Sequence, residues 1–286
     1  MDDLRWDDRP SLRAPVLVVA FEGWNDAGDA ASTAAAYLAD AWSTRPFAHI
    51  DPEEFYDFTV TRPQVRLDDG LARRLDWPDN RFSAAALPGR SHDVVFLQGV
   101  EPQLRWRRFC STVTGLAQDV GAHLVVTLGA LLADVPHTLP VRVTGFAGDE
   151  ELARRLSLER SRYEGPTGIV GVLHDAFRQV GIPSASLWAA VSHYVAQTPS
   201  PKATLALVQH AADLLGASVQ TTDLEIASAA YERQVSEVVA ADDDVSDYVR
   251  RLEEAYEEGQ REPRLQMLSG DALADEVERF LRDEGS

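Results

Sequence analysis

Cysteine and lysine are almost missing from this sequence of 286 residues, in which Cys110 and Lys202 are the only examples of each. A single cysteine excludes an internal disulfide and any metal site built from several cysteines. We expect Cys110 to be a small buried apolar residue. The P-loop of nucleoside triphosphatases requires G-x-x-x-x-G-K-[ST], and the only lysine lies in SPKAT, far from any such loop. The sequence therefore excludes this class of enzyme.

Other catalytic signatures are missing as well. The chain has no G-x-G-x-x-G dinucleotide fingerprint, no G-x-S-x-G nucleophile elbow and no H-E-x-x-H zinc motif. Its seven histidines are dispersed, which by itself does not exclude a triad assembled by the fold. The acidic run 242–244 lacks the spacing of a calcium loop, so we interpret it as a solvated helix cap. Whether the protein is an enzyme stays open, although the missing signatures favour a protein that is not one. We expect no cofactor and no bound metal.

Long apolar runs and excess positive charge are also lacking. No run of 18 apolar residues occurs, and the N-terminal MDDLRWDDRP is charged where a secretory signal would be apolar. These features predict a cytoplasmic protein with no membrane segment. The net charge of −19 disfavours nucleic acid as a partner, because such binding depends on Lys and Arg contacts to phosphates.

Buried strands and helices alternate along the first three quarters of the chain. Apolar runs predict strands at 15–21, 92–99, 122–130 and 184–194, and amphipathic segments predict helices at 29–42, 106–120, 168–180 and 201–215. The expected N-caps are Asn25 or Asp26, Thr167 and Ser200, with Gly181 and Gly216 as C-terminal stops. The alternation predicts a three-layer α/β/α sandwich with a mostly parallel sheet. Segment 43–91 is less regular, and VRLDDGLARRL within it is either a hairpin or a loop insertion.

The C-terminal quarter differs in composition. From residue 218 onward, 19 Asp and Glu stand against 7 Arg. Two apolar stripes predict an acidic helical hairpin: Leu224, Ala227, Tyr231, Val235 and Val238, then Val245, Val249, Leu252 and Tyr256. We expect Asp244 to cap the second helix, and a further amphipathic helix at 272–281. The predicted domains are thus 1–217 and 218–286. Because the stripes have no obvious partner within the chain, we predict that they contribute to a subunit contact.

The loops that follow the predicted strands supply the candidate site, because ligands of open α/β sheets bind beyond the carboxyl ends of the strands. The first of these loops, in FEGWNDAGDAAS, has the strand, glycine turn and helix order of a phosphate site but lacks its glycine spacing and its lysine. Acidic Glu22 and Asp26 would repel an anion there. The candidate binding residues are Gly23, Trp24, Asn25, Asp26, Gly28, Glu101, Arg105 and His137.

Each candidate has a structural alternative. Gly23, Asn25, Asp26 and Gly28 suit a turn and a helix cap whatever else they do. Glu101 and Arg105 are four residues apart, where an ion pair is an ordinary helix feature. Trp24 either packs beneath its loop or faces outward as an anchor for a partner.

Four motifs in order carry a resemblance to a known family: GWNDAG, FLQGVEPQLRW, YEGPTGIVGVLHDAF and WAAVSHYVAQTPSPKATLALV. As a set they resemble the PAC2 family, named for a proteasome assembly chaperone, over roughly residues 12–216, and the acidic hairpin resembles its actinobacterial branch. The resemblance implies an α/β/α sandwich like that of nucleoside phosphorylases, homo-oligomers with a trimer as the expected size, and a chaperone-like role with no catalytic residues to carry over. Proteasome subunits are the partners it suggests.

One departure from the family pattern narrows this expectation. Archaeal and eukaryotic relatives that act on the proteasome commonly end in a hydrophobic residue, a tyrosine and one more residue, whereas the present sequence ends in RFLRDEGS. We therefore do not expect proteasome assembly through such a tail. The alternative function is a small-molecule binding protein or enzyme that takes a nucleoside-like or carboxylate ligand at the strand ends, a hypothesis that rests on fold analogy.

Overall fold

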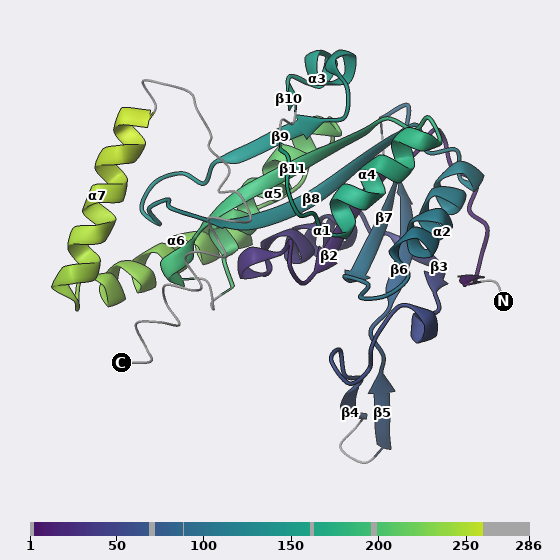
Figure 1. The fold of residues 1–286 in the computed structure, drawn as a ribbon, viewed down its shortest axis with the longest axis horizontal. Coiled ribbons are helices and arrows are strands. Elements are labelled where there is room, and N and C mark those ends of the chain that lie inside the picture. The colour runs from purple at the N-terminus through teal and green to yellow at the C-terminus, as the bar shows by residue number, and fades with distance from the viewer. Residues whose placement is uncertain (1–2, 69–71, 88, 161–162, 196–198, 260–286) are drawn as a thin grey trace.

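The computed structural model describes residues 3–68, 72–87, 89–160, 163–195 and 199–259 (Figure 1). Its main sheet has nine strands among these residues, in the order β1-β3-β6-β7-β2-β8-β11-β9-β10. Their bounds are β1 Leu4–Trp6, β2 Val16–Glu22, β3 Arg45–Ile50, β6 Asn80–Ala86, β7 Asp93–Val100, β8 Leu124–Ala133, β9 Val143–Ala147, β10 Glu159–Arg160 and β11 Ser184–Ser192. Strands β7, β2, β8 and β11 are parallel neighbours at the centre, whereas the pairings β1–β3, β3–β6, β6–β7 and β11–β9 are antiparallel.

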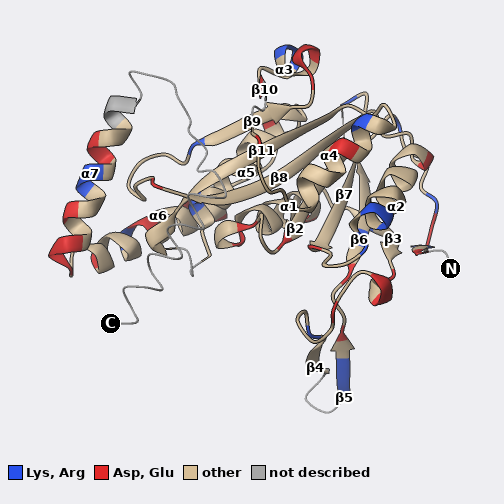
Figure 2. Cartoon of the chain, in the orientation of Figure 1, with Lys and Arg blue, Asp and Glu red and all other residues tan. Residues whose placement is uncertain are grey.

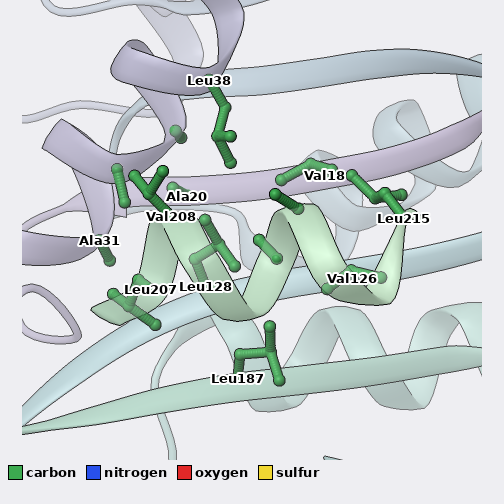
Figure 3. Packing of buried hydrophobic residues seen from close by; sticks show 14 of the residues in the cluster. Val18, Ala20, Ala31, Leu38, Val126, Leu128, Leu187, Leu207, Val208 and Leu215 are labelled. Atoms are coloured by element: carbon green, nitrogen blue, oxygen red, sulfur yellow. The ribbon is translucent and has the colours of Figure 1, made fainter. Parts of the chain in front are cut away.

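Helices cover both faces of this sheet. Helices α1 (Ala30–Ala41) and α5 (Pro201–Leu214) pack on one face, and α2 (Trp106–Asp119) and α4 (Ile169–Gln179) pack on the other. Alternate residues of β2 divide between the two cores, with Val18 facing α1 and α5 and Val19 facing α2 and α4. Figure 3 shows the first core, where Leu207 and Val208 of α5 lie against the strands. The predicted α/β/α sandwich is confirmed.

The four strands and four helices expected from apolar patterning are present, and most predicted caps are as expected. Ser200 accepts a hydrogen bond from the backbone N–H of Ala203, and both Gly181 and Gly216 have positive φ. Thr167, however, does not cap α4, whose N-cap residue is Gly168 with no side-chain cap of its own. The first backbone N–H of α4, that of Ile169, instead donates a hydrogen bond to the side chain of Glu101 from another loop.

The irregular segment 43–91 contributes two antiparallel strands, β3 and β6, to the sheet, and neither was predicted. The run RPFAHI of β3 contains a proline and a histidine, so it lacks the continuous apolar pattern of the central strands. Between them, β4 (Gln64–Asp68) and β5 (Ala72–Asp76) form a separate antiparallel hairpin that projects from the body. The hairpin interpretation of VRLDDGLARRL is therefore confirmed. Strands β1, β9 and β10 and the short helix α3 (Glu150–Leu156) were not predicted either.

The acidic helical hairpin is present as α6 (Thr222–Val239) and α7 (Asp243–Gly259). Asp242 rather than Asp244 caps α7, because the Asp242 carboxylate accepts hydrogen bonds from the N–H groups of Asp244 and Val245. The predicted helix at 272–281 lies outside the described residues. The proposed boundary at 217 falls between α5 and α6, which pack against each other.

The apolar stripe of α6 has a partner within the chain, contrary to our expectation. Tyr231, Val235 and Val239 form a small core with Val249 of α7, and Tyr194 and Val195 from the loop after β11 pack on it. Val238, predicted to belong to the stripe, is exposed. Most of the stripe is therefore buried within the chain, because α7 and the loop after β11 both pack against α6.

Candidate functional site

The carboxyl ends of the four parallel strands lie along one edge of the sheet. The turn after β2 joins the start of the loop after β7 through a hydrogen bond of 2.9 Å from the Glu101 N–H to the Glu22 carbonyl oxygen. Gly23 has φ of 122°, a value that favours glycine, and its position lets the turn approach Glu101 closely. Two of the predicted loops therefore form one structural unit.

Glu101 links this turn to helix α4. One oxygen of its carboxylate accepts a hydrogen bond of 3.3 Å from the Trp24 backbone N–H, and the other accepts one of 3.0 Å from the Ile169 N–H at the first position of α4. A carboxylate at this place also interacts favourably with the positive end of the helix dipole. The alternative of a Glu101–Arg105 ion pair is wrong, because Arg105 pairs with Glu54.

Gly168 completes the unit, and it was not among the predicted site residues. A β-carbon on Gly168 would lie 2.8 Å from Asn25 Nδ2, 3.0 Å from a Glu101 carboxylate oxygen and 3.0 Å from the Trp24 ring. The three motifs that contain GWN, VEP and GPTG thus meet at one point. The glycine of GPTG was visible in the sequence, but nothing in the pattern placed it beside the other two motifs.

Asn25 and Asp26 are buried and hold the turn to its neighbours. The Asn25 carbonyl oxygen accepts a hydrogen bond of 2.8 Å from Ala130 N–H in β8. The Asp26 carboxylate accepts bonds from the N–H groups of Ala31 and Ser32 in the first turn of α1 and from the Ser32 hydroxyl. Asp26 therefore acts as the predicted cap of α1, although it precedes the helix by four residues. Gly28, with φ of 60°, lies in the single 3-10 turn between them.

The electrostatics of this edge disfavour an anion. Loss of solvation raises the pKa of Glu22, and the nearby negative charges of Asp26, Asp29 and Asp79 add to the effect. Burial likewise raises the pKa of Asp26, although its hydrogen bonds from Ser32 and Ala31 oppose the change. The N-termini of α1 and α4, which would otherwise attract a phosphate, already bind carboxylates of this chain. The turn has the strand, turn and helix order of a phosphate site, but side-chain carboxylates of the same chain accept the hydrogen bonds that a phosphate would accept.

Trp24 points outward. Its side chain is 59% exposed although its backbone N–H is fixed by Glu101. Leu104, in the same loop as Glu101, is also exposed, and its N–H bonds to the Phe55 carbonyl oxygen. The edge therefore presents apolar side chains on loops that hydrogen bonds hold in place.

His137 belongs to a different cluster. Its Nδ1 lies 2.8 Å from the Tyr194 hydroxyl and its Nε2 lies 3.0 Å from the Ser236 hydroxyl of α6. Lys202 donates a hydrogen bond to the His137 carbonyl oxygen and forms an ion pair with Glu232 of α6. His137 and Lys202 thus attach the acidic helical hairpin to the sheet, and their contacts do not include the Trp24 turn.

Asp134, in the loop after β8, and His193, in the loop after β11, also contact the helical hairpin. His193 Nδ1 lies 3.0 Å from an Asp134 carboxylate oxygen, and the Tyr248 hydroxyl of α7 donates a bond of 3.3 Å to the same carboxylate. The loops after β8 and β11 therefore serve as a base for α6 and α7. Within the described residues, no helix combines the length and the apolar character needed to cross a membrane.

Comparison with known proteins places these features in a family. The model of the PAC2 family matches residues 20–239. A PAC2 family protein from Streptomyces avermitilis is 48% identical, with a TM-score of 0.77, over 82% of this chain and 99% of its own. A proteasome-assembly chaperone homologue from Mycobacterium tuberculosis is also 48% identical, with a TM-score of 0.74 and the same coverage. No curated protein matches the chain.

A more distant structure shares the fold. An archaeal proteasome activator from Pyrococcus furiosus is 18% identical and has a TM-score of 0.68 over 83% of this chain and 99% of its own. The matched segment 20–239 contains the Trp24 turn, Glu101, Gly168 and helix α6. The chain therefore belongs to the PAC2 family.

Proposed function

We propose that this protein is a non-enzymatic, self-associating chaperone-like protein of the cytoplasm that binds protein partners through the strand-end edge. The observation that carries the proposal is the exposed Trp24 side chain on a turn whose backbone Glu101 fixes. Tryptophan is enriched among the residues that dominate binding energy at interfaces, and a fixed backbone lowers the entropy lost on binding. The proposed partners are proteasome subunits, supported by the names of two relatives.

The backbone N–H groups at this edge already have acceptors within the chain, which favours binding of a protein over binding of a small molecule. Carboxylates of the chain occupy the backbone donors that a phosphate or carboxylate ligand would use. The large apolar side chains that these loops expose are Trp24 and Leu104, and the charged residues Glu22, Asp29 and Arg105 are exposed in the same loops. Exposed apolar side chains on loops that also expose the carboxylates of Glu22 and Asp29 are suited to a protein partner whose own surface is apolar and basic.

A binding experiment with matched variants tests the proposal. Purified protein is mixed with proteasome α and β subunits from the same organism, and complexes and assembly rates are followed by size-exclusion chromatography. We expect Trp24→Ala to weaken the complex at least tenfold, whereas Val180→Ala, an exposed residue at the far end of α4, leaves it unchanged. Absence of a complex with the wild-type protein would overturn the proteasome partner, and equal binding by Trp24→Ala would overturn the role of this edge.

A thermal-shift screen tests the alternative of a small-molecule protein. Nucleosides, nucleotides and small carboxylates are added, and a ligand at 100 times its Kd stabilises the folded state by about 2.7 kcal/mol. We expect no stabilisation by any of them. A shift that Glu101→Gln or Asn25→Ala alters would favour a ligand at the strand ends instead.

A further inference from the structure

The β4–β5 hairpin has an apolar face that its own chain leaves exposed. Val65 pairs with Leu75 and Leu67 pairs with Arg73, so these four side chains share one face of the two-stranded sheet. The apolar members and the following Trp77 are between 47% and 61% exposed. The other face is polar, where Asp76 forms ion pairs with Arg66 and Arg74.

A two-stranded hairpin with an uncovered apolar face is at best marginally stable in water. The hairpin is anchored at its base, where the Trp77 ring packs edge-on against Phe58 with centroids 4.8 Å apart, but its strands project from the body. Exposed apolar surface on such a projection is typical of a protein interface. The charges on the hairpin indicate what covers it.

Residues 64–76 carry three arginines and three aspartates, but among the paired residues of the apolar face Arg73 is the only charged one. Arg73 stands exposed on the apolar face beside Leu67 and Leu75, and the pairs on the opposite face use the Asp76 carboxylate twice. A matching surface therefore needs exposed apolar side chains surrounded by negative charge. A surface of the same sign would be repelled from Arg73.

Helices α6 and α7 have this composition. Residues 222–259 contain twelve acidic residues and three arginines, and Figure 2 shows the acidic positions along both helices. Among them, Ile226 is 68% exposed and Val238 is 73% exposed, and neither is one of the buried residues of the internal core. Asp223 and Glu225 both precede Ile226 within one helical turn, and Glu237 precedes Val238.

We propose that the β4–β5 hairpin of one copy of this chain docks on the exposed surface of α6 and α7 of a second copy. The two surfaces are different and project from different sides of the body, so the contact is head-to-tail, and each copy can give its hairpin to one neighbour and receive that of another. Repetition of the contact joins several copies, in a closed ring where the rotation between neighbours permits it. This inference rests on the self-association in the proposed function and does not depend on the proteasome as a partner.

Complementation between two variants tests the head-to-tail contact. The hairpin variant carries Leu67→Asp and Leu75→Asp, and the helix variant carries Ile226→Asp and Val238→Asp. All four positions are exposed, so we expect both variants to keep the wild-type circular dichroism and urea midpoint. Light scattering coupled to size-exclusion chromatography should show an oligomer for the wild type and for the control Val180→Asp, and a monomer for each variant.

Mixing the two variants should then give a heterodimer and nothing larger. The hairpin variant keeps intact helices and the helix variant keeps an intact hairpin, so one contact forms and the other is blocked. A monomeric wild type would overturn self-association itself. An oligomeric wild type whose variants stay assembled, or variants that dissociate but do not combine on mixing, would overturn this contact and leave the Trp24 binding edge untouched.

Discussion

Glu101 caps helix α4 across a separation of 68 residues, with its carboxylate oxygen 3.0 Å from the Ile169 backbone nitrogen. The same side chain also fixes the Trp24 turn after β2. One carboxylate therefore joins the ends of two central strands to the start of a helix on the sheet. The strand-end edge is therefore held together by contacts within the chain.

Removal of the Glu101 carboxylate should destabilise the fold. Glu101→Ala leaves the N–H groups of Trp24 and Ile169 without their acceptor, and we expect a loss of about 1–3 kcal/mol in the free energy of unfolding. Glu101→Gln keeps an acceptor oxygen but no charge, so its loss should be smaller. Urea denaturation measures both, and equal stability of Glu101→Ala and wild type would contradict the capping role.

Gly168 should not tolerate even a methyl group. The added carbon of Gly168→Ala would meet Asn25, Glu101 and Trp24 at 2.8–3.0 Å, and we expect a loss of roughly 1–3 kcal/mol from this overpacking. Gly115→Ala is the matched control, because Gly115 lies inside α2 with open space at its β position. That change should stabilise the protein by about 0.5–1 kcal/mol. Thermal and urea unfolding should therefore show a lower stability for Gly168→Ala and a higher stability for Gly115→Ala than for the wild type.

His174 should make stability depend on pH. Its ring nitrogens contact the hydroxyls of Thr127 and Ser184, and burial lowers its pKa to about 4. Because this pKa lies below the unfolded value of about 6.5, the unfolded chain takes up the proton first, and stability is lost as the pH falls through 6.5 toward 4. Between pH 7.5 and 5.5 the contribution of this group is a loss of about 1 kcal/mol.

The variant His174→Gln measures this contribution. Its unfolding free energy should change less between pH 7.5 and 5.5 than that of the wild type, by about 1 kcal/mol. His210→Gln, at an exposed position on α5, should keep the wild-type dependence. A wild-type pH dependence in His174→Gln would show that His174 is not the group responsible.

Adjacent valines on α6 should behave differently. Val239 is in the small core with Tyr231, Val235 and Val249, so Val239→Ala should cost roughly 1–2 kcal/mol through lost burial. Val238 is exposed, and Val238→Ala should change stability by less than about 0.5 kcal/mol. Urea unfolding of the two variants shows which valine faces the core. A larger loss for Val238→Ala than for Val239→Ala would place Val238 in the core and contradict the structure.

Local patterns predicted the parts of this fold that local chemistry decides. The continuous apolar runs of β2, β7, β8 and β11 mark strands buried on both faces. Ser200 was recognisable as a cap because it lies directly before Pro201 and its helix. The strands β3 and β6 were missed because their mixed composition reflects a position toward the edge of the sheet, where one apolar run is not required.

The candidate residues divided in a way that the sequence could not show. Trp24, Asn25 and Glu101 meet at Gly168, and Gly23 lies against Glu101. Arg105 instead pairs with Glu54, and His137 supports α6. The apolar spacing placed Val238 in the stripe, but packing of α6 against α7 and the loop after β11 buries Val239 instead. Each of these outcomes depends on which segments become neighbours.

The sequence by itself determined the layered α/β core, the acidic helical hairpin and the family, because burial on both faces, helical periodicity and ordered motifs are all present in short segments. Only the tertiary structure decided that Trp24 faces outward and that Glu101 caps α4. Those outcomes depend on contacts between residues far apart in the chain, such as the bond between Glu101 and Ile169, which no local pattern encodes. The physical reason is that a helix end or a turn needs a partner, and the fold alone determines which distant side chain supplies it.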